Sequence, residues 1–364
     1  MDIELRTVRD DVDYWVVRAG KGGRYLENFL EGKIASIGHM DGIELSPNSL
    51  TTENLSNTLS KLTAKLKSEE KKKGTINAIV SQARKFVTDI KVGDIIISVD
   101  ENRMVAGVVE SDVYVDSKTI KIYDVHGEPI GHELQHLVRR KVKWDNFQRK
   151  VNVPQSVKTS LKANQTLFCV TEHWRTLNHW LSVIFQKEDS LYFSTRIDTQ
   201  DAIHNLDINE YTTALIQAEA ISSYLSEGNN LENELDEEEL SQAILNTYAK
   251  MKADRSFGIT TQQSFMSPGD YWGELPGSDL KRAVFVAVFA CLLNVNVVYA
   301  EDSQPVQLAK IQEVTKKVSK IISAENNLDI VKSNLSVRVP RQASLSDLDD
   351  LSMPEAKPDE FVGQ

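Results

Sequence analysis

Cysteine is scarce in this chain of 364 residues, which contains only Cys169 and Cys291. Two cysteines so far apart cannot build a disulfide framework, and they lack the paired spacing of a zinc ribbon or knuckle. Both lie within apolar runs, so we expect buried, reduced thiols in a cytoplasmic protein. Residues 1–15 are charged throughout and have no apolar core region, so we do not expect a secretory signal peptide there.

The chain also has fewer positive than negative side chains. It contains 42 Lys and Arg residues and 53 Asp and Glu residues, so its net charge is −11. A uniformly acidic surface would repel the phosphates of a nucleic acid. The acidity is confined to one part of the chain, however. Residues 1–174 contain 26 basic and 24 acidic side chains, and the remainder contains 16 basic and 29 acidic ones. Only the first part therefore has a charge balance suited to nucleic acid.

One run without charge stands out, Ala283–Ala300. Its length is the lower limit for a helix that spans a membrane. Only Ala283–Leu293 is continuously apolar, and that stretch covers about 16 Å as a helix, half of a bilayer core. We therefore expect a buried helix followed by a strand. A membrane-spanning helix, in a membrane-associated effector whose first domain senses a ligand, is the alternative.

The hydrophobic patterns together predict an α+β protein. Residues 1–172 are rich in short apolar strands, which indicates a barrel or sheet with peripheral helices. Amphipathic helices are expected at 54–66 and 76–90, where apolar residues recur at helical spacing. Residues 173–335 predict a mainly helical α+β domain. Residues 336–364 are rich in Ser, Asp and Pro, and we expect a disordered acidic tail.

Three shorter segments carry notable charge or aromatic side chains. Leu137–Trp144 alternates apolar and basic residues, which predicts a half-buried strand with its charges facing solvent. The acidic run 232–239 predicts a solvated loop and a helix N-terminus, where carboxylates favour the dipole, or else a patch that docks a basic partner. Residues 268–273 predict a loop, either a packed turn or a contact surface with exposed Tyr and Trp.

Four ordered segments of the first domain read YWVVRAGKGGRYLENFLEGKIASIGH, KGTINAIVSQARKFVTDIKVGDIIISVDENRMVAGVV, HLVRRKVKW and VPQSVKTSLKANQTLF. Together they resemble the EVE-like domain, a PUA-superfamily barrel at the N-terminus of Mrr-type and related restriction proteins. The resemblance covers about residues 12–170. It implies a small barrel that reads nucleic acid, in many relatives by accepting a flipped, often modified, base into an aromatic pocket. It also implies a restriction or antiphage defence setting. As the partner we favour DNA over RNA. The family usually has Trp where this chain has His39.

The first domain offers residue types that such recognition requires. Lys61–Lys91 contains nine basic and three acidic residues, and Arg139–Lys150 contains six and one, which fits contacts to phosphates. An unstacked base also needs a flat apolar surface and hydrogen-bond donors, and Tyr25 and Phe147 add to the aromatic candidates. The alternative is that the tryptophans are core residues and the lysine-rich helices are solvated faces. The candidate nucleic-acid-binding residues are Trp15, Arg18, Lys21, Ser36, Gly38, His39, Arg84, Arg139, Lys141, Lys143 and Trp144.

Two motifs suggest other chemistry and are set aside. Residues 132–136 read H-E-L-Q-H, but a zinc protease needs these two histidines on one helix, and Pro129 and Gly131 immediately precede them. We expect a chance match in a loop, with a metallohydrolase as a further alternative. Residues 20–23 (GKGG) lack the spacing of a phosphate loop and predict a turn. Without a convincing catalytic set, we predict no catalytic residues, no metal and no cofactor. We expect the second domain to couple recognition to a protein partner or a homo-oligomer.

Overall fold

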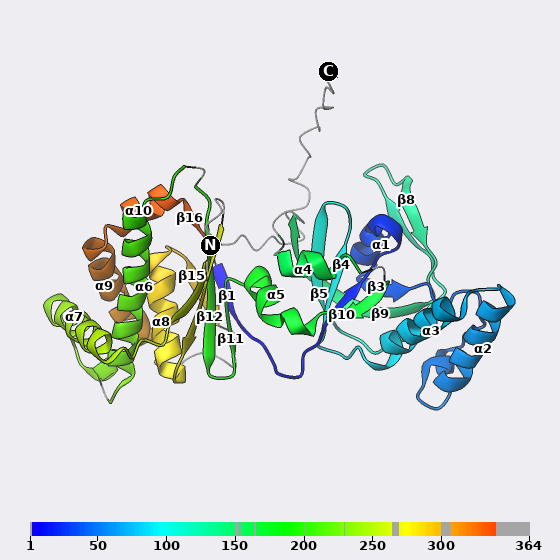
Figure 1. Ribbon diagram of the computed structural model, residues 1–364, viewed down its shortest axis with the longest axis horizontal. Helices are drawn as coiled ribbons and strands as arrows, with labels where there is room; N and C mark the ends of the chain where they lie inside the picture. The colour runs from blue at the N-terminus through cyan, green and yellow to red at the C-terminus, as the bar shows by residue number, and fades with distance from the viewer. Residues whose placement is uncertain are drawn as a thin grey trace, which may run out of the picture. The chain divides into compact units, whose positions relative to one another are not determined.

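The computed structural model describes residues 2–149, 153, 155–163, 165–199, 201–228, 230–263, 269–299 and 307–339. It is an α+β protein with mixed sheets, which confirms the expected class. The chain forms two compact units (Figure 1). We call residues Val12–Trp174 the first unit, and Met1–Asp11 together with Arg175–Arg341 the second unit. The sequence analysis assigned residues 1–11 to the first domain, and the structure corrects this, because Ile3 and Leu5 are buried in the core of the second unit.

The first unit is built on a curved, half-barrel sheet with one parallel pair among antiparallel ones. Its apolar strand residues form one core with the helices around it. The parallel pair consists of the strands Tyr14–Val17 and Ile95–Val99. The strands lie in the order β10 (Leu167–Cys169), β2 (Tyr14–Val17), β4 (Ile95–Val99), β5 (Arg103–Val109), β9 (Val138–Arg149) and β3 (Ile34–Ile37), and β6 (Tyr114–Val115) also pairs with β9.

Both amphipathic helices predicted for the first unit are present, as α2 (Leu55–Ser68) and α3 (Lys73–Thr88). Their apolar residues are buried and their polar residues face outward, as the spacing predicts. The turn expected at residues 20–23 is a short helical turn, η1 (Lys21–Gly23). The remaining elements are α1 (Leu26–Glu31), η2 (Pro47–Leu50), α4 (Gln155–Ser160), η4 (Thr171–His173) and the separate two-stranded sheet of β7 (Ile120–Tyr123) and β8 (Pro129–Leu134).

The second unit contains a larger mixed sheet than the sequence analysis expected. Its strands lie in the order β13 (Thr260–Gln263), β14 (Gly269–Pro276), β12 (Ser190–Ile197), β11 (Ile184–Lys187), β1 (Asp2–Thr7) and β15 (Asn296–Tyr299), and β16 (Val337–Arg338) also pairs with β12. β1 is parallel to both of its neighbours.

The helices of the second unit lie mostly on one face of this sheet, and α6, α8 and α9 cover it in Figure 1. Phe193 of β12 packs there against Phe285 and Phe289, with ring centroids 5.3 and 5.0 Å away. These aromatic contacts fix the sheet to the helical layer. The helices are α5 (Trp174–Leu181), α6 (Asn205–Ser226), η5 (Asn230–Glu232), α7 (Glu237–Asp254), α8 (Asp279–Leu292), α9 (Leu308–Glu325) and α10 (Leu328–Leu335).

The segment expected to be a loop at residues 268–273 is a strand from Gly269 onward, and Pro268 lies outside the described residues. Tyr271 and Leu275 are fully buried on the helical side, so the segment has the two-residue period of a strand. A Cβ at Gly273 would lie 2.0 Å from the ring of Phe193. Glycine is therefore required at this position because the aromatic ring lies directly over the backbone.

The uncharged run forms the buried helix α8 and then the strand β15, as expected, and Ala300 lies outside the described residues. In the part of the chain that the structure describes, no helix is long and apolar enough to cross a membrane. The acidic run does lead into a helix. Asp236 caps α7 by accepting a hydrogen bond from the Glu239 amide, and the Glu239 side chain accepts one from the Asp236 amide.

Two further expectations need correction. Residues 336–339 of the expected tail are described, and Val337 pairs with Ile197 of β12, so this part of the tail belongs to the sheet. The rest of the tail lies outside the described residues. Cys169 is exposed and Cys291 is half-buried, so the expectation of two buried thiols is wrong. An apolar neighbourhood in sequence does not fix which side of a short strand faces the core.

Candidate nucleic-acid interface

A cluster of polar and aromatic side chains lies just beyond the end of β3 in the first unit. We call Tyr25, His39, Asp41 and His136 the β3-end cluster. The Nδ1 atom of His136 lies 2.6 Å from Oδ2 of Asp41, and the Leu137 amide donates to Oδ1 of the same carboxylate at 3.2 Å. The Tyr25 ring meets the His136 ring edge-on, with centroids 5.2 Å apart. The cluster therefore combines an aromatic surface with hydrogen-bonding groups.

The cluster is half-buried and remains accessible. The side chains of His136 and Asp41 are 21% and 35% exposed. Among the described residues, the Nε2 atom of His136 has no hydrogen-bond partner in the structure. Because both oxygens of Asp41 are occupied, the carboxylate orients the histidine ring and leaves its outer nitrogen available to a ligand.

Gly38 allows this close approach. A Cβ atom at Gly38 would lie 2.4 Å from Cε1 of His136, well inside van der Waals contact. A larger residue would therefore displace the histidine ring from Asp41. The candidate role of Gly38 becomes sharper in the structure, because this backbone makes room for a residue nearly a hundred positions further along the chain.

Within the cluster, His39 is held by a contact with α3. Its Nε2 atom lies 3.4 Å from Oε1 of Gln82, and the same amide oxygen accepts hydrogen bonds from the backbone amides of Thr166 and Leu167. Burial lowers the pKa of His39, and the nearby His136 lowers it further, while Gln82 and Asp41 act in the opposite direction. His39 is therefore neutral near pH 7 and can both donate and accept a hydrogen bond.

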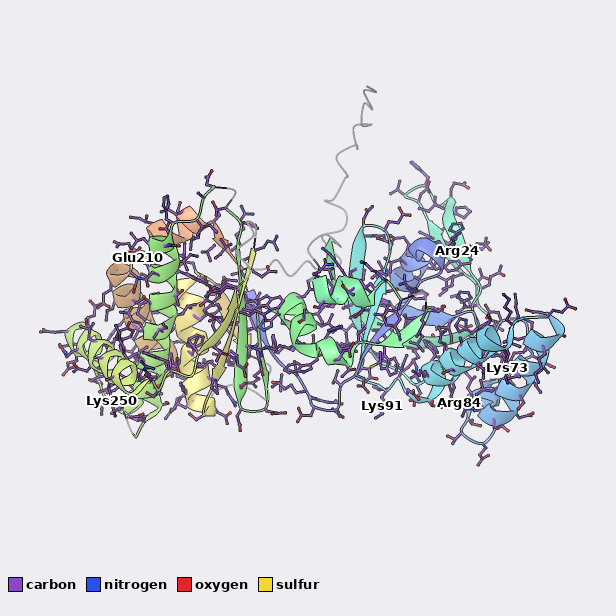
Figure 2. All side chains as sticks on the ribbon, in the orientation of Figure 1. Arg24, Lys73, Arg84, Lys91, Glu210 and Lys250 are labelled. Carbon is purple, nitrogen blue, oxygen red and sulfur yellow. The ribbon has the colours of Figure 1, made fainter. Side chains whose placement is uncertain are left out.

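The cluster is joined to both basic helices. Lys65 of α2 donates from Nζ to the Asp41 carbonyl at 2.8 Å, and Gln82 on α3 contacts His39. Lys73, Arg84 and Lys91, which lie on α3 and the turn after it, are labelled in Figure 2 and are exposed. The remaining exposed cations on these two helices and their connection are Lys61, Lys67, Lys71, Lys72 and Lys85.

Several predicted site residues lie in the core of the first unit. Trp15 is 4% exposed and donates from Nε1 to the buried Asp94 at 3.1 Å. Trp144 is 6% exposed and donates from Nε1 to the carbonyl oxygens of Phe29 and Ile34 at 3.0 and 3.2 Å. Both indole N–H groups therefore have hydrogen-bond partners inside the unit. The two tryptophans are core residues, as the alternative to a base-reading surface had it. The side chain of Phe147 lies outside the described part.

The predicted basic residues divide into exposed ones and ones that backbone carbonyls hold, such as the half-buried Arg18. Arg18 donates to the carbonyls of Leu161, Ala163 and Gln165, at 2.5, 2.9 and 3.0 Å, and so holds the loop after α4. Lys141 and Lys143 are exposed on β9, and Lys21 and Arg84 are exposed as well. These four are free to meet a phosphate from solvent.

The expectation that all charged residues of the β9 strand face solvent is wrong at Arg139 and Arg140. Arg139 is 1% exposed and pairs with Asp116 at 3.0 Å. Arg140 is 2% exposed and donates to the carbonyls of Phe86 and Val87, both at 3.0 Å, at the end of α3. Burial lowers the pKa of Arg140 to about 10, so it keeps its charge at neutral pH. The alternation pattern failed here because adjacent arginines in a strand can both be buried where backbone carbonyls receive them.

Ser36 is the last of the predicted residues. It is 1% exposed, and its hydroxyl has no hydrogen-bond partner among the described residues. Ser36 lies opposite Arg139 in the β3–β9 pair, two residues before Gly38. Because it is buried, Ser36 does not meet a ligand from solvent.

The H-E-L-Q-H motif does not form a helix. His132 and Glu133 lie on strand β8, Glu133 pairs with Lys121 at 2.7 Å, and His136 belongs to the β3-end cluster. Within the described ranges, no group of three His, Cys, Asp or Glu side chains is placed to hold a metal ion. The helical geometry that the zinc motif requires is thus not present at these residues.

Sequence reasoning named His39 and Gly38 but missed Asp41, Gln82 and His136 as members of the site. His136 had a visible signal in the motif that was set aside, and Asp41 follows His39 closely. No sequence pattern links Asp41 to a histidine on the far side of two helices and several strands. No protein-family model matches this chain, and neither a curated protein nor a solved structure matches it.

Proposed function

We propose that the first unit binds nucleic acid, with DNA favoured over RNA, and that the β3-end cluster receives an unstacked and in some cases modified base. The observation that carries this proposal is the contact of a half-buried cluster with both basic helices, through Lys65 and Gln82. A base needs a flat surface and hydrogen-bonding groups, and Tyr25 with His39 and His136 offers both. The resemblance to EVE-like domains supports the same proposal, with the curved sheet as a PUA-like barrel.

The exposed cations would position the nucleic-acid backbone. Some lie on α2 and α3, the two helices that contact the cluster through Lys65 and Gln82, and Lys141 and Lys143 lie on β9. Contacts between lysine or arginine and phosphates carry affinity and orientation, while the cluster would supply selectivity. In this proposal the second unit, which holds most of the negative charge, couples binding to a protein partner or a homo-oligomer, in a restriction or antiphage defence setting within the cytoplasm.

A salt titration of the full chain tests the backbone part of the proposal. We expect binding to a short DNA duplex or single strand to weaken steadily as salt rises. On duplex DNA the logarithm of the binding constant should fall by about 0.9 per phosphate contact for each tenfold rise in salt. The variant Lys73→Gln/Arg84→Gln should bind more weakly and with a shallower salt slope. The matched control Lys250→Gln/Lys320→Gln removes two exposed lysines from the second unit and should leave both unchanged. No binding by the wild-type protein at low salt refutes the proposal.

The cluster part is tested with bases of different chemistry. Asp41→Asn keeps the size of the side chain but weakens its hold on His136, so it should reduce discrimination between modified and unmodified duplexes. The salt slope should stay at the wild-type value, because no phosphate contact is removed. Equal affinities of the wild-type protein for every cytosine and adenine modification would argue against base reading at this site.

A further inference from the structure

The hairpin of β7 and β8 carries the two most exposed large apolar side chains among the described residues of the first unit. Tyr123 is 58% exposed, Val125 is 95% exposed and Ile130 is 49% exposed, all within one short hairpin. The hairpin forms its own two-stranded sheet and pairs with neither large sheet (Figure 1). Large apolar side chains gathered at an exposed tip mark a contact surface more often than isolated ones do.

The base of this hairpin is clamped from both sides. Buried Arg139 donates to the His136 carbonyl at 2.7 Å on the outgoing side, and on the incoming side to Asp116 at 3.0 Å and to the Lys118 carbonyl. Asn28 of α1 donates to the carbonyls of Ile120 and His132, at 3.0 and 2.8 Å, and so ties both strands to the helix. An isolated two-stranded hairpin is only marginally stable in water. These hydrogen bonds therefore hold the base of the β7–β8 hairpin in place against the rest of the first unit.

The hairpin ends beside the β3-end cluster. The His132 ring of β8 lies 6.2 Å from the Tyr25 ring, and His136 lies two residues after the end of β8. The turn at the tip is closed locally, because the Asp124 carboxylate accepts hydrogen bonds from the amides of His126 and Glu128, both at 2.9 Å. This carboxylate is thus engaged by the turn itself, and Tyr123 and Val125 stand on either side of it.

We propose that the hairpin tip, residues 123–130, is a wedge that inserts Tyr123 and Val125 into the base stack of a DNA duplex and so exposes a base to the β3-end cluster. This rests on the proposed nucleic-acid function. Apolar side chains that enter a base step partly unstack it, and an extruded base must be received nearby. The hairpin has a clamped, apolar tip at one end, and its other end lies beside the half-buried polar cluster, so it offers both a wedge and a receiving site.

The test uses the full chain and a DNA duplex that contains one 2-aminopurine, whose fluorescence rises when it is unstacked, together with the matching single strand. Wild-type protein should raise the fluorescence of the duplex. The variant Tyr123→Ser/Val125→Ser should lose most of this rise and bind the duplex about tenfold more weakly, the size of one lost stacking contact. Its affinity for the single strand should fall less than twofold, because a single strand needs no wedge.

The matched control is Val92→Ser, which removes an exposed valine (51% exposed) from the same unit outside the hairpin and should behave as wild type. An unchanged fluorescence rise and duplex affinity in the hairpin variant overturn the wedge, and would leave the exposed tip as a protein contact. Duplex binding by wild type without any rise overturns the wedge and leaves intact the nucleic-acid-binding part of the proposed function. Binding of neither duplex nor single strand overturns both.

Discussion

Replacing the buried His179 with glutamine should remove much of the acid sensitivity of the second unit. His179 is 2% exposed, its Nδ1 atom lies 2.8 Å from the Ser194 hydroxyl, and its ring stacks on Trp272 with centroids 4.8 Å apart. Burial, and to a smaller extent the positive charge of Arg175, together lower its pKa from 6.5 to about 3. The folded protein therefore holds this histidine neutral, and its protonation favours the unfolded state.

The size of the effect follows from the two pKa values. The stability contributed by neutral His179 is fully present above the unfolded pKa of 6.5 and is lost as the pH falls towards the folded value of about 3. Each pH unit in this window costs about 1.4 kcal/mol, so acidification to pH 4 should cost about 3 kcal/mol. That is a large share of the stability of a typical domain, which is about 5–15 kcal/mol.

The assay is hydrogen exchange of the β12 and β14 amides at pH 7 and pH 4, after correction for the intrinsic exchange rate. These strands flank His179 and report on the second unit alone. The free energy of protection should fall between pH 7 and pH 4 in both proteins, and the fall should be about 3 kcal/mol smaller in His179→Gln than in wild type. This difference does not depend on the stability of the variant at pH 7. The control His204→Gln changes an exposed histidine of the same unit and should match wild type. Equal losses in wild type and His179→Gln would refute the argument.

Three further predictions concern packing and charge. Gly273→Ala places a Cβ against the Phe193 ring and should lower stability by about 1–3 kcal/mol, seen as an earlier thermal transition; an unchanged midpoint would contradict the close approach. Arg140→Met leaves the carbonyls at the end of α3 without their donor and should cost about 2–4 kcal/mol in urea denaturation, whereas the exposed Lys141→Met should cost almost nothing. Since burial lowers the pKa of His39, its neutral form contributes stability above about pH 6.5 that is lost as the pH falls. His39→Gln should therefore reduce the pH dependence of first-unit unfolding, and an identical dependence would exclude the effect.

The parts of the fold that depend on local pattern could be predicted from the sequence. The leucine spacing of α2 and the charged cap at Asp236 each act within a few residues, so both helices were found. The run from Ala283 was divided correctly because its periodicity changes after the helix. These features need no information about distant residues.

The rest depends on contacts between distant residues. Strand β14 was interpreted as a loop because Gly269 and Gly273 are typical of turns, and only the ring of Phe193 explains the second glycine. The site was found only in part for the same reason. His39 and Gly38 came from a family resemblance, whereas the pairing of Asp41 with His136 exists only after the β3–β9 pair and the hairpin have formed.

The position of β1 imposes an order on how this protein is made. β1 is synthesised before both strands that it pairs with: it lies between β11 and β15, and pairs with residues 184–186 and 296–299. These partners are synthesised much later, so β1 has no partner strand when it leaves the ribosome. Residues Val12–Trp174 form a compact unit by themselves and can fold as soon as they emerge. The second sheet closes only after β15 has been made. Interrupted synthesis would therefore yield a folded first unit to which β1 is attached without its partner strands. The unpaired backbone groups of β1 would make such a product prone to aggregate.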